Sequence, residues 1–226
     1  MIKLHHTALS THCRPVVAFL AESGLSYEAC PVDLSKGEHK SPAFLALNPA
    51  GAVPVLEHDG FVLSESSAIL KYLADVAGSP LYPADLKARA RVNERMDWFN
   101  TGFEAHVAFQ LTYPQILPHH ARATPELTKA TAEWGRDKAA AGFELLDKHL
   151  IGPSGWIAGD SITIADLLGA SIATLPRLIG GSFERYPRVA AWLARVESRP
   201  SWQGANAAFV GLEKALAGKP FVSIGA

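Results

Sequence analysis

The spacing of the apolar residues changes once along this chain, near Gly78, and this change limits the possible folds more than any other feature. Before Gly78, short strand-like runs alternate with helix-like segments, and after it apolar residues recur at helical spacing. Strands that alternate with helices indicate a sheet covered by helices, whereas a run of helices indicates a helical bundle. The sequence therefore predicts an α/β domain over residues 1–78, a linker over 79–87 and an all-α domain over 88–226.

The α/β domain is predicted to have the element order β-α-β-α-β-β-α and a mixed four-stranded sheet. Its clearest signal is Asp59-Gly60 between two apolar runs, because a tight hairpin turn needs positive φ at both central residues. Pro15 fits the first turn of a helix, and Gly24 fits a helix end. The expected strands cover 2–8, 27–34, 53–58 and 61–63, and the expected helices cover 15–23, a short segment from Ser41 and a segment that ends at Gly78.

In the all-α domain, Pro and Gly residues separate the expected helices. Pro114 is interpreted as one of these breaks, following a first helix that ends at Phe109. Thr163 and Asp166 form the pattern of a capping box, in which the Asp166 carboxylate reaches back to the Thr163 N–H. The expected helices cover 87–109, 124–150, 163–172, 189–198 and 202–217.

Composition argues against several classes of function. The formal net charge is −1, with −3 before residue 79 and +2 after it, so neither part has the basic surface that binds nucleic acid. The two cysteines, Cys13 and Cys30, form no disulfide framework or zinc spacing, and no metal site is expected. The longest apolar run, Val16 to Ala21, is too short to span a membrane, and the start does not resemble a signal peptide. A soluble cytoplasmic protein is expected.

Two short segments carry the candidate chemistry. The first, Leu9 to Arg14, follows the first expected strand and places a serine and a cysteine just before a helix. The second combines Val53-Pro54 with the run from Ser64 to Leu70 after the hairpin. Each motif is short and weak by itself, but their occurrence together and in this order is specific.

At these residues the chain resembles the cytosolic glutathione transferases. The Ser10-x-x-Cys13-Arg14 run is similar to the serine-type branch, particularly the theta class and its bacterial relatives. The tyrosine-type branch has a tyrosine near position 6, where this chain has His5 and His6. The resemblance covers nearly the whole length. It implies a thioredoxin-like first domain, glutathione as co-substrate, a homodimer, and attack of glutathione on a small hydrophobic electrophile by conjugation or dehalogenation.

The resemblance implies that Ser10 is the catalytic residue and holds the glutathione sulfur as a thiolate. A free thiol has a pKa near 8.5, and lowering it by roughly two units requires about 2.7 kcal/mol. One hydrogen bond to a charged acceptor supplies about 1.5–3 kcal/mol, so a single hydroxyl is nearly sufficient. The alternative is that Ser10 is only a turn or cap residue. Cys13 is a competing nucleophile, for which a buried structural position is the alternative.

The resemblance also assigns the peptide part of glutathione to residues of the second segment. Val53, before a cis Pro54, would pair its backbone with the cysteinyl part. Glu65 would accept a hydrogen bond from the γ-glutamyl ammonium, and Ser66 would bind the γ-glutamyl carboxylate, since helix N-termini attract anions. The alternative for Glu65 and Ser66 is a plain helix cap with an acidic first turn.

Two further regions receive roles from the resemblance. The loop residues His39 and Lys40 would contact the glycine carboxylate, and a solvated surface pair is the alternative. The electrophile is expected between the domains, against the first long helix of the second domain. The candidate lining residues are Phe103, His106 and Tyr113.

The chain departs from the theta pattern at one position. In that pattern an acidic residue of the partner subunit reaches the γ-glutamyl amine, but here Asn93 occupies the position, with Glu94 beside it. Two alternative functions are a glutathione-dependent isomerase of the zeta type and a non-catalytic binding protein with the same fold. The Ser10 to Arg14 run fits the zeta pattern less well, and a pure scaffold would not need the whole set of glutathione-binding residues.

Overall fold

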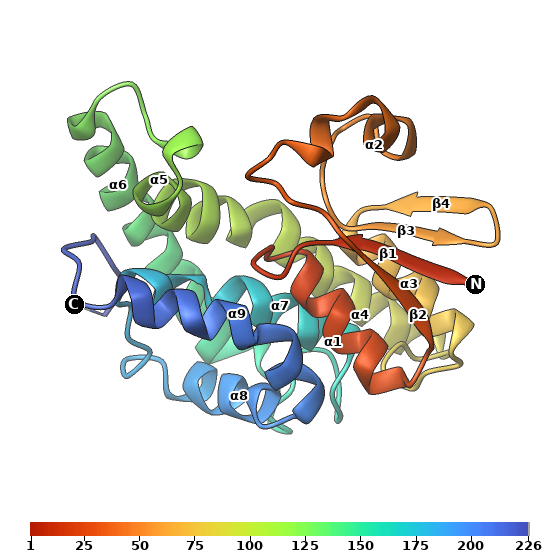
Figure 1. Cartoon of the computed structure of the whole chain (residues 1–226). Coiled ribbons are helices and arrows are strands. Elements are labelled where there is room, and N and C mark those ends of the chain that lie inside the picture. Colours follow the sequence, from red (N-terminus) through yellow and green to blue (C-terminus); the bar gives the residue numbers. More distant parts are fainter. Residues whose placement is uncertain (226) are drawn as a thin grey trace.

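A mixed four-stranded sheet with the order β2-β1-β3-β4 organises the first part of the chain (Figure 1). The computed structural model describes residues 1–225. β1 pairs in parallel with β2 and antiparallel with β3, and β3 pairs antiparallel with β4. Asp59 and Gly60 both have positive φ, which confirms the predicted hairpin. The strands are β1 (Ile2–His6), β2 (Tyr27–Pro31), β3 (Val55–His58) and β4 (Phe61–Ser64).

Three helices cover the two faces of this sheet, as Figure 1 shows. Leu4 and Leu56 point to the face covered by α1 (Cys13–Ser23) and α3 (Ser66–Val76). Because successive strand residues alternate between faces, Val55 points to the other side, where it packs with Phe44 of α2 (Pro42–Leu47). The order β-α-β-α-β-β-α and the thioredoxin-like fold are therefore confirmed.

Three strands are shorter than predicted at the ends that face the candidate site. Chain reversals replace the missing residues: the Ser10 N–H bonds the Thr7 carbonyl at 3.3 Å, and the Asp33 carboxylate accepts the Ser35 N–H at 2.9 Å. β3 begins at Val55 rather than Val53. The predicted strands 2–8, 27–34 and 53–58 were thus too long, because loop residues with apolar side chains were counted as strand.

The regular elements in the rest of the described chain are helices, and the first of them differs from the prediction. Pro114 does not separate two helices, because it lies in the first turn of a short α-helical segment that directly follows a π-helical segment, whose wider turns change the hydrogen-bond register there. The helix therefore continues beyond Phe109 through two π-helical segments. Its parts are α4 (Leu86–Trp98), η2 (Phe99–Phe103), η3 (Ala105–Thr112) and α5 (Tyr113–Ile116).

The later helices pack around a buried centre formed by α7. Asp166 accepts the Thr163 N–H at 2.8 Å, so the predicted capping box is present, and it also accepts the Trp192 indole N–H at 2.9 Å. No helix within residues 1–225 is long and apolar enough to cross a membrane. The remaining helices are η1 (Glu38–Lys40), η4 (Pro118–His120), α6 (Pro125–Leu145), η5 (Leu146–Leu150), α7 (Ile164–Ala173), η6 (Leu175–Ile179), α8 (Pro187–Glu197) and α9 (Pro200–Leu216).

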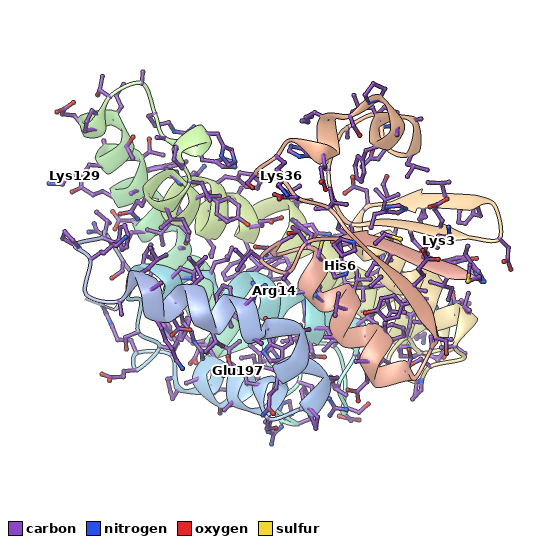
Figure 2. All side chains as sticks on the ribbon, viewed as in Figure 1. Lys3, His6, Arg14, Lys36, Lys129 and Glu197 are labelled. Carbon is purple, nitrogen blue, oxygen red and sulfur yellow. The ribbon has the colours of Figure 1, made fainter. Side chains whose placement is uncertain are left out.

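The sheet region and the helical region share one continuous apolar core. Arg14 of α1 is buried at their junction (Figure 2), where its guanidinium donates to Asn206 at 2.6 Å and to the Ser171 carbonyl at 2.7 Å. The same group lies 4.0 Å from the ring centre of Phe209. α1 is thereby fixed against α7 and α9, and the loop that precedes it is held in a defined place.

Candidate active site

The sheet topology brings four separate segments to one end of the sheet. The last residue of β1, His6, pairs with the last residue of β2, Pro31. The first residue of β3, Val55, pairs with His5 of β1 and with Ser64, the last residue of β4. The segments that extend from this end contain all the residues predicted to bind glutathione: Ser10, His39, Lys40, Val53, Pro54, Glu65 and Ser66.

Ser10 lies between β1 and α1 with a half-buried side chain. Its Oγ accepts the backbone N–H of Cys13 at 3.3 Å, and its carbonyl accepts the N–H groups of Cys13 and Arg14 at 3.1 Å. Ser10 therefore does stabilise the start of the helix. Within residues 1–225 the hydroxyl makes this one hydrogen bond, as acceptor, so its own proton remains available to a ligand.

Cys13 is 1% exposed and lies in the core. Burial raises the pKa of its thiol to about 11, and hydrogen bonding to Ser10 and to the Thr7 backbone opposes the rise only in part. At neutral pH the group is therefore a thiol rather than the nucleophilic thiolate. The structural alternative for Cys13 agrees with this environment.

Glu65 and Ser66 begin α3 in an unusual backbone conformation. Glu65 has φ 69° and ψ 113°, a region that residues other than glycine rarely adopt and that costs on the order of 1–3 kcal/mol. Such strain is concentrated at ligand sites. Ser66 is 5% exposed, and its Oγ lies 2.9 Å from Nδ1 of His12.

Lys40 and Val53 are connected through the turn that ends at Gly51. Lys40 Nζ donates to the Gly51 carbonyl at 3.3 Å, and a Cβ on Gly51 would lie 2.9 Å from the His39 carbonyl. The loop that carries His39 and Lys40 is thus packed against the segment that leads to Val53. The Val53–Pro54 peptide is cis, and Val53 lies before the first paired residue of β3.

The three candidate electrophile residues do not lie together. The Tyr113 hydroxyl lies 2.7 Å from Thr11 Oγ1, directly beside the Ser10 loop. Phe103 is 3% exposed and stacks on Trp98 within the core. His106 contacts Trp134 of α6 and belongs to a different face of the helix. Of these three residues, Tyr113 is the one that contacts the loop that carries Ser10.

Asn93 and Glu94 are both occupied within their own chain. The Tyr82 hydroxyl donates to the Asn93 side-chain carbonyl at 3.1 Å. Glu94 pairs with Arg91 and, at 3.5 Å, with Arg95.

Sequence reasoning missed His12 and Glu104. His12 Nε2 lies 2.7 Å from Glu104 Oε1, while the other ring nitrogen contacts Ser66. A signal was present, because Glu104 is an acidic residue between the apolar positions 103 and 107 of a buried helix face. No group of three His, Cys, Asp or Glu side chains within residues 1–225 is arranged to bind a metal ion.

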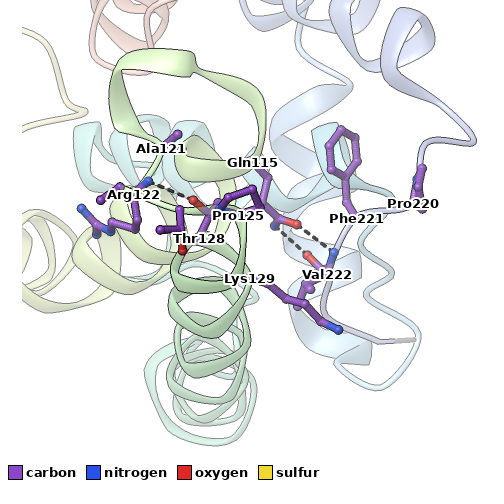
Figure 3. Close-up of a pocket in the computed structure, with 11 residues that line it drawn as sticks. Gln115, Ala121, Arg122, Pro125, Thr128, Lys129, Pro220, Phe221 and Val222 are labelled. Atoms are coloured by element: carbon purple, nitrogen blue, oxygen red, sulfur yellow. Dashed lines mark hydrogen bonds between the residues drawn. The ribbon is translucent and has the colours of Figure 1, made fainter.

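A cavity of about 750 Å³ lies elsewhere, beside the start of α6 and the C-terminal segment (Figure 3). There the Gln115 side chain donates to the Val222 carbonyl at 2.9 Å and accepts the Val222 N–H at 2.8 Å. Its lining residues all lie within 115–129 and 220–222, so it contains none of the segments at the end of the sheet.

Two family models match the chain. The model described as "Glutathione S-transferase, N-terminal domain" matches residues 3–75, and "Glutathione S-transferase, C-terminal domain" matches residues 103–200. Glutathione S-transferase theta-1 of Mus musculus is 34% identical over 205 residues, which cover 88% of this chain and 83% of the relative. Glutathione S-transferase theta-2 of Homo sapiens is 34% identical over 200 residues, which cover 87% of this chain and 81% of the relative.

Solved structures show the same likeness. Human glutathione transferase theta-2, determined in complex with glutathione and an unknown ligand, has a TM-score of 0.81 and 32% identity, and the match covers 100% of this chain and 94% of that chain. The apo form of human glutathione-S-transferase T1-1 has a TM-score of 0.81 and 30% identity, and the match covers 98% of this chain and 93% of that chain.

Proposed function

Because this chain belongs to the glutathione S-transferase family and is a theta-like glutathione transferase, we propose that Ser10 activates the thiol of glutathione as a thiolate. The thiolate then attacks a small hydrophobic electrophile, by conjugation or by displacement of halide. In the second case the sulfur forms a bond to carbon and the halide leaves with the bonding electrons. The observation that carries the proposal is the Ser10 hydroxyl, which donates no hydrogen bond within residues 1–225 and lies at the sheet end from which the other candidate segments extend.

The magnitudes support a single hydroxyl in this role. A shift of about two pKa units corresponds to about 2.7 kcal/mol of preference for the thiolate. One hydrogen bond to a charged acceptor supplies about 1.5–3 kcal/mol. The N-terminus of α1, whose first residue is Cys13, adds about 0.3–1 kcal/mol for a nearby anion.

The peptide part of glutathione is proposed to lie along the other three segments. The backbone of Val53 is outside the strand pairing and is available to the cysteinyl amide groups. Glu65, held at positive φ, accepts from the γ-glutamyl ammonium, and Ser66 binds the carboxylate. His39 and Lys40 take the glycine carboxylate. The His39 ring supports this role because its Nδ1 is buried without a hydrogen-bond partner in the described chain.

The electrophile is proposed to bind beside Tyr113. Burial raises the pKa of the Tyr113 hydroxyl to about 12, so it remains a neutral donor at physiological pH. Phe109 and His120 surround the Tyr113 ring at centroid distances of 5.4 and 5.2 Å. This aromatic group provides an apolar wall next to the Ser10 loop, which favours a small hydrophobic electrophile.

The Ser10→Ala variant tests the proposal. With an activated aryl or alkyl halide, we expect kcat to fall by about 10- to 100-fold, because the loss of a hydrogen bond to a charged group corresponds to that range. At about pH 6, where the bound thiol is mostly protonated in both proteins, the Kd for glutathione is expected to change less than about twofold, since the peptide contacts remain. The exposed Ser35→Ala variant is the matched control. Full turnover by Ser10→Ala would exclude the role of Ser10.

A further inference from the structure

A chain of hydrogen bonds runs from the helical region to the proposed γ-glutamyl site. Glu104 lies between η2 and η3, and its Oε1 is 2.7 Å from His12 Nε2. Nδ1 of the same ring is 2.9 Å from the Oγ of Ser66 at the start of α3. The side chain of Glu104 is 6% exposed, whereas that of His12 is 33% exposed.

The burial of Glu104 explains why its contact with His12 holds the ring in place. A buried carboxyl group is unfavourable without a hydrogen-bond partner, and within residues 1–225 His12 is the one partner of Glu104. Rotation of the ring away from Glu104 would leave that group buried and unpaired. Glu104 therefore fixes the His12 ring with Nδ1 directed at Ser66.

The His12 ring in turn fixes the Ser66 hydroxyl. Its Nδ1 lies 2.9 Å from Ser66 Oγ, which holds this oxygen in one position at the N-terminus of α3. Without the contact the Ser66 side chain could rotate among its staggered rotamers. A fixed hydroxyl binds an anionic ligand group better than a rotating one, because less side-chain freedom is lost on binding.

We propose that Glu104 and His12 are positioning residues for glutathione: Glu104 fixes the His12 ring, and His12 fixes the Ser66 hydroxyl beside the γ-glutamyl carboxylate. This inference rests on the proposed function of Ser66. It also connects the regions, because a residue of the helical region sets the affinity of a site built on α3. Neither residue touches the sulfur, so the pair acts on glutathione affinity rather than on the chemical step.

Two substitutions of His12 separate orientation from simple space filling. The Asn amide nitrogen overlays Nδ1 and keeps a donor for Ser66, whereas the Gln amide nitrogen overlays Nε2 and keeps only the contact with Glu104. We expect His12→Gln to raise the KM for glutathione about 10-fold or more, with kcat at saturation within about threefold. His12→Asn is expected to recover a large part of this loss.

Glu104→Gln and His149→Gln complete the series. Glu104→Gln keeps the shape of the side chain but weakens the hydrogen bond that fixes the His12 ring, because a neutral amide is a weaker acceptor than a carboxylate, so we expect the KM to rise in the same direction as in His12→Gln. His149 is exposed and lies in η5, so His149→Gln is the matched control and is expected to keep the wild-type KM. Thermal unfolding of each variant confirms that it is folded, and Glu104→Gln serves as the test if His12→Gln does not fold.

The decisive measurement uses a second ligand, a glutathione analogue whose γ-glutamyl carboxylate is replaced by a carboxamide. Calorimetry with His12→Gln is expected to show about 10-fold weaker binding of glutathione but less than twofold weaker binding of the analogue. Equal weakening of both ligands, or of neither, would overturn the inference. Wild-type protein that binds no glutathione at millimolar concentration, or that binds the analogue as tightly as glutathione, would instead contradict the proposed function and remove the basis of this inference.

Discussion

Ser10 and Cys13 are separated by one turn of chain at the start of α1, and their surroundings give them different chemistry. Cys13 is 1% exposed, and burial holds the pKa of its thiol at about 11. Ser10 is half-buried at the sheet end, and its hydroxyl donates no hydrogen bond within residues 1–225. A buried thiol in an apolar setting cannot form a thiolate easily, whereas a partly exposed hydroxyl can donate to the thiolate of a ligand.

Alkylation of the folded protein tests this contrast at the level of single residues. Cys13 is buried and its pKa is about 11, so about 1 thiol in 10,000 is ionised at pH 7, whereas Cys30 is partly exposed. We expect iodoacetamide to modify Cys30 and leave Cys13 intact, as read by peptide mass spectrometry. Both residues should react after unfolding in urea. Rapid modification of native Cys13 would contradict the assigned environment.

The sequence predicted the residues at the sheet end better than the contacts between them. Ser10, Val53-Pro54 and Glu65-Ser66 were identified because each lies beside a strand or hairpin signal that can be recognised locally. The contact of His12 with Glu104 spans 92 positions and depends on how the long helix passes the Ser10 loop. No local pattern encodes that placement.

At the level of elements, the long helix from Leu86 to Ile116 shows where helical periodicity is misleading. The expected end at Phe109 followed from counting Pro114 as a break, but the wider π-helical turns before Pro114 change the register and the proline begins a new turn. In the same way, strands 1 to 3 were predicted too long because apolar loop residues were counted as strand. The type and order of the major elements were nevertheless predicted correctly.

Close packing of α6 against η3 provides a prediction at this scale. A Cβ on Gly135 would lie 2.7 Å from the backbone carbon of Gln110 and 2.8 Å from the Leu111 nitrogen. Gly135→Ala must therefore shift backbone, and we expect it to lower the free energy of unfolding by about 1–3 kcal/mol in urea titrations.

The exposed Gly211 of α9 is the matched control. No atom lies within 4 Å of the position of its Cβ, so Gly211→Ala should raise the free energy of unfolding by about 0.5–1 kcal/mol through helix propensity. Equal changes in the free energy of unfolding for the two alanine substitutions would contradict the close backbone packing of α6 against η3.

At the level of the whole molecule, the site depends on both regions at once. Arg14 fixes α1 against the helical region, Tyr113 contacts the Ser10 loop, and Glu104 contacts His12. The predicted two-region organisation could be inferred from the change in periodicity, but these contacts could not. They require the shared core that joins the sheet to the helices.

We also propose that the protein forms a homodimer, as the family resemblance implied. Exposed apolar side chains on the edge strand β4, Phe61 and Val62 at 49% and 38% exposure, support an interface there. Light scattering should give twice the chain mass at micromolar concentration, and Phe61→Glu should shift the species toward the monomer. A monomer at all concentrations would contradict this proposal.

Ser10 is proposed to act by stabilising the glutathione thiolate, and the pKa of enzyme-bound glutathione measures this effect directly. The thiolate absorbs in the ultraviolet more strongly than the thiol, so a pH titration of the complex gives the pKa. We predict that the pKa of the bound thiol is lowered from about 8.5 to about 6.5 in the wild type. In Ser10→Ala we expect this pKa to rise most of the way back to about 8.5. Thiolate is then present in the wild-type complex above pH 6.5 and is lost below it. The same low pKa in both proteins would contradict the central role of Ser10.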